Sequence, residues 1–206
     1  MKTILLIRHS VKEKSYIADK NTDRQKFDEQ KKLSEEGKKI AIKLSQMDIL
    51  KNVDEVWASK YQRAIETAKI LFNKRINISD SFDERHYGDF KPNTDIENFW
   101  IEQFKNEDLK NNNGESQKDV RTRFDNKINY ILNNSHSNEI AIVSHNAAIL
   151  FYLLKYCTLI SAEIPKKLTI SYKNKTLIKG SIMKSPSIMK LTFDNDNLID
   201  IEYIEI

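Results

Sequence analysis

Two arginines and two histidines stand at the ends of predicted β-strands or in the first turn of the helix that follows a strand. They are Arg8, His9, Arg63 and His145. In an open α/β sheet the carboxyl ends of the strands form the ligand-binding edge, so we expect these side chains to meet there. Guanidinium groups offer planar forks of donors, and helix N-termini favour anions. The residues alone therefore predict a site for a dianionic phosphate.

Other interpretations exist for each residue taken singly. Arg63 can pair with Glu66 or Glu84, and His145 can be a hydrogen-bonded histidine of the core. Two histidines can also bind a metal ion, but no carboxylate–histidine spacing typical of a metal site accompanies them. The placement of all four residues at strand ends on one side of a sheet favours phosphate, and we expect no metal.

The elements that must position these residues follow from hydrophobic patterning. Buried strands are predicted over residues 2–7, 53–58, 75–78 and 139–144, and helices over 34–47, 59–72, 94–104, 116–132 and 147–156. Ser34 and Ser59 are expected to cap the helices that they precede. Later strand-like runs cover 168–172, 176–178, 188–193 and 199–204, with a hairpin turn at 194–197. Residues 10–32 have no clear period.

This alternation of strands and helices predicts an α/β protein with three layers, α/β/α. The central sheet is expected to be mainly parallel, with an antiparallel C-terminal hairpin at one edge. We find no internal repeat or linker, so residues 1–206 are expected to form one domain, with a substrate-facing insertion around 79–114.

Composition narrows the class of protein further. The 206 residues include one cysteine, which excludes an internal disulfide framework and a zinc site built from cysteines. No apolar run approaches the ~20 residues of a membrane span. The net charge of +4 comes from lysines interspersed with acidic residues, which favours neither nucleic acid nor a membrane as partner. We expect a cytoplasmic protein that binds small anions.

Six segments, in order along the chain, resemble the motifs of the histidine phosphatase (phosphoglycerate mutase-like) superfamily, in its phosphatase branch. They are Leu6-Ile7-Arg8-His9, Leu33-Ser34-Glu35-Glu36-Gly37, the run from Ala58 to Ala68 around Ser59 and Arg63, Glu84-Arg85-His86-Tyr87-Gly88, Gly114-Glu115-Ser116 and Val143-Ser144-His145-Asn146. The resemblance spans essentially the whole chain.

The resemblance implies a metal-independent phosphomonoester hydrolase that needs no cofactor and takes a small phosphorylated substrate. It implies that His9 is the nucleophile, which carries a phosphohistidine intermediate, and that Glu84 is the general acid and base. Its phosphate-binding residues correspond to Arg8, Arg63 and His145. Residues expected at the substrate rim are Ser15, Tyr87 and Asn146.

Two residues depart from the family's pattern and bear on the alternatives. Ser10 stands where the family usually has glycine, and Ser15 stands where many members have a phosphate-binding asparagine. The acid loop at 84–88 is close to the form found in phosphoglycerate-type mutases, which keeps that activity as an alternative. Mutases, however, usually carry Trp-Asn after the first motif and an Arg-Arg pair mid-chain, and residues 93–113 contain no arginine. A non-catalytic phosphoryl-binding module is the third alternative.

Overall fold

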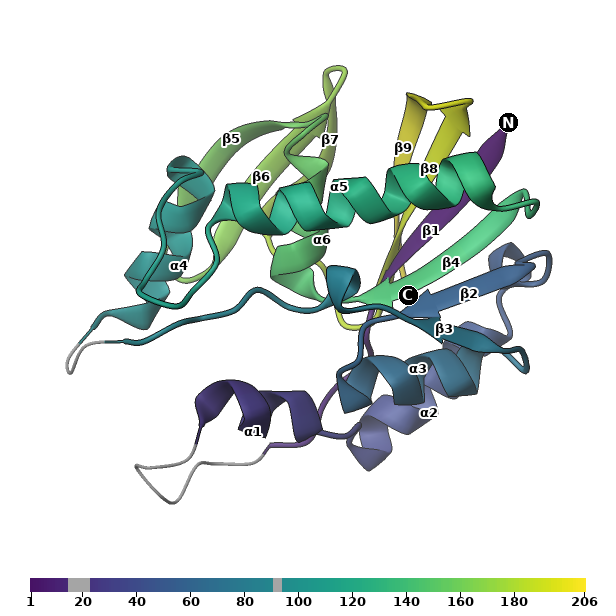
Figure 1. Cartoon of the computed structure of the whole chain (residues 1–206), viewed down its shortest axis with the longest axis horizontal. Helices are drawn as coiled ribbons and strands as arrows, with labels where there is room; N and C mark the ends of the chain where they lie inside the picture. The colour runs from purple at the N-terminus through teal and green to yellow at the C-terminus, as the bar shows by residue number, and fades with distance from the viewer. Residues whose placement is uncertain (15–22, 91–93) are drawn as a thin grey trace.

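The fold is built around a six-stranded sheet with helices on both faces (Figure 1). In the computed structural model, residues 1–14, 23–90 and 94–206 are described. The sheet has the order β3-β2-β4-β1-β8-β9. Its strands are β1 (Lys2–Arg8), β2 (Glu55–Ala58), β3 (Ile76–Ile78), β4 (Glu139–Ser144), β8 (Ser187–Asp194) and β9 (Asn197–Glu205). The main helices are α1 (Arg24–Gln30), α2 (Glu35–Ser45), α3 (Gln62–Leu71), α4 (Ile96–Lys105), α5 (Gln117–Asn134) and α6 (Asn146–Leu153).

The expected mainly parallel sheet with an antiparallel C-terminal hairpin at one edge is confirmed. β1, β4, β2 and β3 are parallel, whereas β8 pairs antiparallel with β1 and forms a hairpin with β9 at the edge. Asn195, at the hairpin turn, has a φ of 52°, a backbone conformation that asparagine tolerates better than most residues. The composition of the strands and the turn residues therefore suffice to place this edge.

Side chains of β1 alternate between two hydrophobic layers, which is why the whole strand is apolar. Leu5 and Ile7 pack in the cluster that contains residues of α2 and α3. Ile4 and Leu6 pack in the cluster that contains residues of α5 and α6. A strand buried on both faces is typical of a parallel sheet between two helical layers. The predicted three-layer α/β/α architecture is confirmed.

Of the two predicted helix caps, Ser34 is confirmed and Ser59 is wrong, and a third cap at Ser116 was not predicted. Ser34 caps α2 by accepting a hydrogen bond from the Gly37 amide, and Ser116 forms a capping box with Asp119 at the start of α5. Ser59 does not cap α3, because that helix begins at Gln62 with Tyr61 at the N-cap position. The Ser59 hydroxyl is instead used by the side chains of the site described below.

A second, antiparallel sheet was not expected. It contains β5 (Thr158–Glu163), β6 (Lys167–Tyr172) and β7 (Lys175–Ser181) and is separate from the main sheet. The last two strands match the predicted runs 168–172 and 176–178. The first was missed because residues 158–163 follow directly on the apolar helix α6 and only Ala162 among them is buried. Patterning predicted two of its strands but not their association into a sheet of their own.

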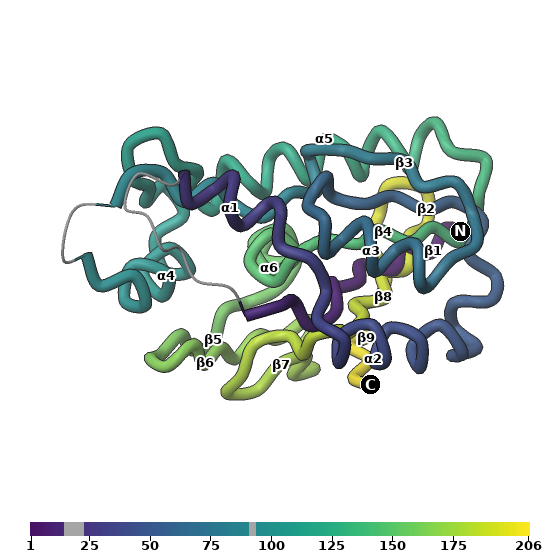
Figure 2. The backbone as a smooth tube through the Cα atoms, turned by 90° about the horizontal axis from the view of Figure 1, so that it is seen from below, coloured from purple at the N-terminus to yellow at the C-terminus, as the bar shows by residue number. Residues whose placement is uncertain are grey.

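Helix α1 was also missed, in the segment without a clear period. It is seven residues long, and its buried residue is Asp28, so it has no apolar stripe for sequence patterning to detect. Both Figure 1 and Figure 2 place α1, α4 and the second sheet toward one end of the long axis, with β3 toward the other. These three elements stand beyond the carboxyl ends of the parallel strands and surround the site. Within the described residues, none of the helices is long and apolar enough to cross a membrane.

Candidate active site

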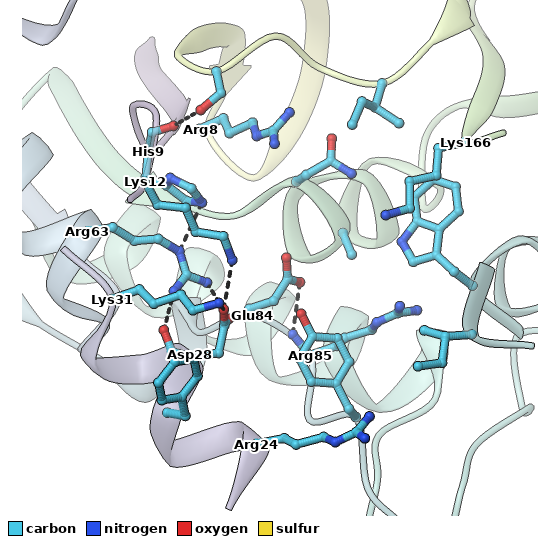
Figure 3. A pocket seen from close by; sticks show the side chains of 18 of the residues that line it. Arg8, His9, Lys12, Arg24, Asp28, Lys31, Arg63, Glu84, Arg85 and Lys166 are labelled. Atoms are coloured by element: carbon cyan, nitrogen blue, oxygen red, sulfur yellow. Dashed lines mark hydrogen bonds and ion pairs between the residues drawn. The ribbon is translucent and has the colours of Figure 1, made fainter. Parts of the chain in front are cut away.

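The carboxyl ends of the parallel strands open onto a cavity of about 760 Å³ (Figure 3). Residues of the sequence-predicted site that line it are Arg8, His9, Arg63, Glu84, Tyr87 and Asn146. His145 does not line the cavity but lies directly behind it, with its ring centroid 5.1 Å from that of His9. The structure therefore brings together residues as far apart in sequence as Arg8 and Asn146, which are 138 positions apart, because β1 and β4 are neighbours in the sheet and Arg8 pairs with Ser144.

His9 is held as a neutral imidazole whose Nε2 keeps its lone pair. It follows β1, and its amide donates to the Ser144 carbonyl of β4 at 2.9 Å. Its Nδ1 lies 2.7 Å from the Ser10 carbonyl, which can only accept, so Nδ1 carries the proton. Its Nε2 accepts from Arg63 Nε at 3.0 Å. Burial and the neighbouring arginines Arg63 and Arg8 lower the His9 pKa well below its usual value, so the ring is uncharged at neutral pH.

Arg63 is fully buried and oriented by a carboxylate from α1. Its Nη2 donates to Asp28 Oδ2 at 2.9 Å, and its Nη1 donates to the Asp28 carbonyl at 2.5 Å. Lys12 Nζ lies 2.7 Å from Asp28 Oδ1, and Lys31 Nζ lies 3.7 Å from the same oxygen. Burial raises the pKa of Asp28, but Arg63 and Lys12 outweigh it and leave that pKa below its usual value.

The partner of Arg63 therefore differs from the two that the sequence suggested. Glu66 accepts from the Leu33 amide at 2.8 Å, and Glu84 lies in the acid loop. Asp28 is a residue that the sequence analysis missed. No signal in the sequence could have found it, because it lies in the aperiodic segment, and it is neither a motif residue nor part of an apolar face.

His145 belongs to a buried relay of polar groups. It lies at the N-cap position of α6 and has no accessible surface. Its Nε2 lies 2.8 Å from Ser59 Oγ, and that hydroxyl lies 2.7 Å from Asp83 Oδ1. Because the Ser59 hydroxyl donates its hydrogen bond to the Asp83 carboxylate, its oxygen accepts from His145 Nε2, and the Nδ1 of His145 keeps a lone pair. That Nδ1 is buried and has no hydrogen-bond partner within the described residues. Burial, with Arg63 next, lowers the pKa of His145 well below its usual value.

Arg8 reaches the site from the end of β1. Its Nη1 donates to the Met183 carbonyl, which belongs to the segment between β7 and β8. The same segment supplies Ser185, whose hydroxyl donates to the His9 carbonyl at 2.6 Å. Arg8 Nε is buried without a partner in the described part of the chain. Burial lowers the pKa of Arg8, because the charged guanidinium loses contact with water. A bound anion would offset this cost of burying the charge.

The structure separates the two neighbouring carboxylates of the acid loop. Glu84 lines the cavity, and its Oε1 accepts from the Arg85 amide at 2.9 Å. Asp83 is turned to the Ser59 hydroxyl and to the Lys60 amide, which lies 3.0 Å from Asp83 Oδ1. Burial raises the pKa of Asp83. Only Glu84 of this pair is placed to reach a molecule in the cavity.

The expected rim residues have different outcomes. Tyr87 lines the cavity, and burial raises the pKa of its hydroxyl, which stays protonated at neutral pH. Asn146 also lines it, and its Oδ1 is buried without a hydrogen-bond partner in the described ranges 1–14, 23–90 and 94–206. Ser15 lies outside the described residues. Ser10 is buried behind the cavity, where its hydroxyl donates to the Gly37 carbonyl at 2.7 Å.

Two of the resembling motifs are structural rather than chemical. A Cβ on Gly37 would lie 2.0 Å from the Val11 carbonyl oxygen, so only glycine fits where α2 approaches the loop after His9. Glu115 accepts from the His86 amide at 2.9 Å and from Arg123 Nε at 2.7 Å. Arg123 also donates to the Ser81 carbonyl at 2.9 Å. The Gly-Glu-Ser motif thus fixes the acid loop in place.

Arg85 is a further residue that the sequence analysis did not select. It is buried, its Nη1 donates to Gln103, and its guanidinium carbon lies 5.4 Å from the centre of the Tyr87 ring. In the described part of the chain, seven arginines and lysines and three carboxylates line the cavity. The cations are Arg8, Lys12, Arg24, Lys31, Arg63, Arg85 and Lys166, and the carboxylates are Asp28, Glu84 and Glu97. This excess of positive charge favours an anionic ligand.

Metal ligation has no support in the arrangement of side chains. Across residues 1–14, 23–90 and 94–206, no group of three or more His, Cys, Asp and Glu side chains is placed to hold a metal ion. Arg63 Nε donates to His9 Nε2 at 3.0 Å, so a guanidinium cation lies where a metal ion would have to bind that nitrogen.

The fold and the site together define an α/β protein with a neutral histidine in a cavity lined by an excess of positive charge. In a comparison with protein families, the histidine phosphatase superfamily (branch 1) matches residues 4–180. The chain belongs to this superfamily. A search of curated proteins finds no match.

Solved structures share the fold at low sequence identity. A mycobacterial glucosyl-3-phosphoglycerate phosphatase is 16% identical, with 100% of both chains covered and a TM-score of 0.68. YhfR of Bacillus stearothermophilus is 17% identical, with 97% of this chain and 95% of that chain covered and a TM-score of 0.66. An H9A mutant of phosphoserine phosphatase from Entamoeba histolytica, in complex with phosphoserine, is 16% identical, with 98% and 97% covered and a TM-score of 0.63.

Proposed function

We propose that this protein hydrolyses phosphomonoesters through a phosphohistidine intermediate on His9. The observation that carries the proposal is the state of that ring. It is neutral, its proton is held on Nδ1 by the Ser10 carbonyl, and its Nε2 lone pair lies among the buried cations of the cavity. A neutral imidazole with a fixed tautomer is an activated nucleophile.

In the first step Nε2 of His9 attacks phosphorus, and the bond between phosphorus and the ester oxygen breaks. Glu84 gives a proton to that oxygen, and the alcohol leaves. In the second step Glu84 takes a proton from water as the water attacks phosphohistidine, and inorganic phosphate forms. The hydrogen bond from Arg63 Nε to His9 Nε2 is exchanged for a hydrogen bond from Arg63 Nε to a phosphoryl oxygen when the substrate binds.

Charge neutralisation is the main task left to the protein, because phosphoryl transfer requires positioning and electrostatic stabilisation more than covalent help. We assign this role to Arg8, Arg63 and His145. The unpartnered Nε of Arg8 is a donor available to a phosphoryl oxygen. His145 becomes a second such donor when its Nδ1 takes up a proton, and Asp83 supports the resulting charge through Ser59. These groups occupy the place that a metal ion holds in other phosphatases.

The named activities of the similar structures support a small phosphorylated substrate. Two of these proteins are named as phosphatases of glucosyl-3-phosphoglycerate and of phosphoserine. They share the fold with this chain, and their substrates differ in size and charge. The proposal for this chain is therefore the reaction class, a phosphoric monoester hydrolase, with the alcohol part of the substrate argued separately below.

Release of inorganic phosphate from a panel of phosphomonoesters, measured in EDTA, tests the proposal. We expect release that survives EDTA and is abolished in His9→Ala. A His9→Ala variant that keeps more than a few per cent of the activity would contradict the nucleophile assignment. No release from any ester by the folded protein would contradict hydrolysis and favour the mutase alternative, which exchange between 2- and 3-phosphoglycerate then tests.

A further inference from the structure

The cavity continues well beyond the group of residues that surround a phosphoryl group. Figure 3 shows Lys166 on the far side of the view from Arg63, with Glu84 and Arg85 between them. Pockets of 300–1,000 Å³ enclose drug-sized ligands, and this one measures about 760 Å³. A substrate as small as phosphoserine would leave most of this space to water.

The walls outside the phosphoryl end are rich in apolar side chains from separate segments. They are Phe27 of α1, Phe90 after the acid loop, Ile96 and Trp100 of α4, and Ile182 after β7. Ile96 is 45% exposed although it is a large aliphatic residue. An exposed apolar side chain is unremarkable alone, but a set of them lining one cavity marks a binding surface.

Two of the three aromatic side chains, Phe90 and Trp100, are held by ring contacts with their neighbours. The Trp100 ring lies 4.6 Å from that of Phe104, which in turn packs on Phe151 at 4.8 Å. The Phe90 ring meets Phe99 edge-on at 5.6 Å. Side chains held in this way lose little freedom when a ligand binds, so contacts with them translate efficiently into affinity.

The position of this surface determines which part of a substrate would contact it. With phosphorus at His9 and the ester oxygen at Glu84, the alcohol must extend away from His9. Ile96 and Trp100 line the cavity from α4, which packs against β5 at the end of the cavity that holds Lys166. We propose that the physiological substrate is a phosphomonoester whose alcohol part carries an aromatic or heteroaromatic ring. This inference rests on the proposed hydrolase activity.

Aromatic walls distinguish a ring from an alkyl chain of similar area. Aromatic pairs in offset or edge-to-face contact contribute roughly two- to tenfold beyond the burial of area. A cation near a ring face adds further attraction, and Lys166 supplies an exposed ammonium group at this end of the cavity. A ring is therefore the better fit to these walls than a flexible chain, which also loses more conformational entropy.

Matched esters of primary alcohols test the inference without a change in leaving-group chemistry. The panel contains ethyl phosphate, n-octyl phosphate, 2-phenylethyl phosphate and 2-(2-naphthyl)ethyl phosphate. We expect kcat/KM to rise on the order of 10- to 100-fold from ethyl to naphthylethyl phosphate, because the ring buries an area like that of a phenylalanine side chain. We expect n-octyl phosphate to fall below naphthylethyl phosphate.

Variants at the surface connect this preference to the wall. Ile96→Gln should lower the naphthylethyl-to-ethyl ratio of kcat/KM roughly three- to tenfold, and Trp100→Leu should lower it further. The matched control is Ile78→Gln, an equally exposed isoleucine at the end of β3 and outside the cavity, which should leave the ratio unchanged. Because Trp100 packs in the core, the exposed Ile96 keeps the test valid if Trp100→Leu fails to fold.

Each result decides between the two proposals. Hydrolysis of ethyl phosphate without any preference for ring-bearing esters would overturn the ring inference and leave the hydrolase proposal standing. Equal preference for n-octyl and naphthylethyl phosphate would also overturn it. Hydrolysis of none of the esters would overturn the hydrolase proposal itself.

Discussion

Replacement of Asp28 by asparagine separates two effects of the carboxylate that holds Arg63. The variant keeps the size of the side chain and the main-chain carbonyl that accepts from Arg63 Nη1, but removes the charge beside Arg63 and Lys12. Buried pairs lose 3–5 kcal/mol when one partner is removed. Arg63 retains its other acceptors and Lys12 is partly exposed, so we expect the free energy of unfolding to fall by about 2–4 kcal/mol.

The same substitution should strengthen the binding of inorganic phosphate. The Asp28 carboxylate and a phosphate bound by Arg63 carry like charges, which at an effective dielectric constant of about 20 repel by about 4 kcal/mol at 4 Å and by about half of that at twice the distance. Water in the open cavity screens part of this repulsion. We therefore expect product inhibition by phosphate to become roughly 10-fold tighter.

Urea unfolding and competitive inhibition by phosphate measure the two effects on one preparation. Asp23→Asn is the matched control, because it removes a charge from the same helix at an exposed cap and asparagine also caps well. Stability within 0.5 kcal/mol of the wild type would show that the Asp28–Arg63 contact contributes nothing to folding. Weaker phosphate binding in Asp28→Asn would show that Asp28 acts by orienting Arg63, and would refute the charge argument.

Three further predictions follow from other parts of the site. Glu84→Gln should lower kcat/KM, which reports the step that releases the alcohol, by about 10²–10⁴-fold on alkyl phosphates and by less on p-nitrophenyl phosphate, whose leaving group needs no proton; equal losses of kcat/KM on both esters would count against Glu84 as the acid. Gly37→Ala should lower the free energy of unfolding in urea by about 1–3 kcal/mol, because its Cβ would meet the Val11 carbonyl oxygen at 2.0 Å; an unchanged urea midpoint would contradict that close approach. Because burial lowers the folded-state pKa of His145, the unfolded chain binds an extra proton below about pH 6.5, and the free energy of unfolding of the wild type falls as the pH drops from about 7 to 5. In His145→Asn the dependence of this free energy on pH should be shallower by up to about 1.4 kcal/mol per pH unit. An identical pH dependence of both proteins in urea titrations would refute the neutral, buried state of His145.

The part of the fold that positions His9 follows from the sequence because it obeys simple rules. An apolar strand such as β1 must be covered on both faces, and Arg8 and His9 must then stand at its carboxyl end. The same logic places His145 after β4. The alternation of strands and helices predicts that the strands run parallel, and the turn residues predict the hairpin of β8 and β9. These features depend on local patterning, which sequence records directly.

The missed features depend on contacts between distant segments. Asp28 holds Arg63 from a helix whose buried face is polar, and Met183 and Ser185, in the segment before β8, accept from Arg8 and donate to His9, respectively. Ser59 has the sequence context of a helix cap, yet its hydroxyl joins Asp83 to His145. The hydrophobic periodicity of a sequence does not predict hydrogen bonds between side chains that are distant along the chain. The one-domain organisation, the cytoplasmic location and the absence of a cofactor stay predictions.

Direct detection of phosphorylated His9 tests the central claim most closely. We expect Glu84→Gln, mixed with p-nitrophenyl phosphate and quenched in alkali, to gain the mass of one phosphoryl group. Peptide mapping should place that group on His9, because p-nitrophenolate leaves without an acid while hydrolysis of the intermediate still needs the Glu84 base. Absence of the adduct in His9→Ala completes the expected result. A phosphoryl group on another residue, or steady turnover in wild-type protein with no labelled His9 at any quench time, would contradict the account.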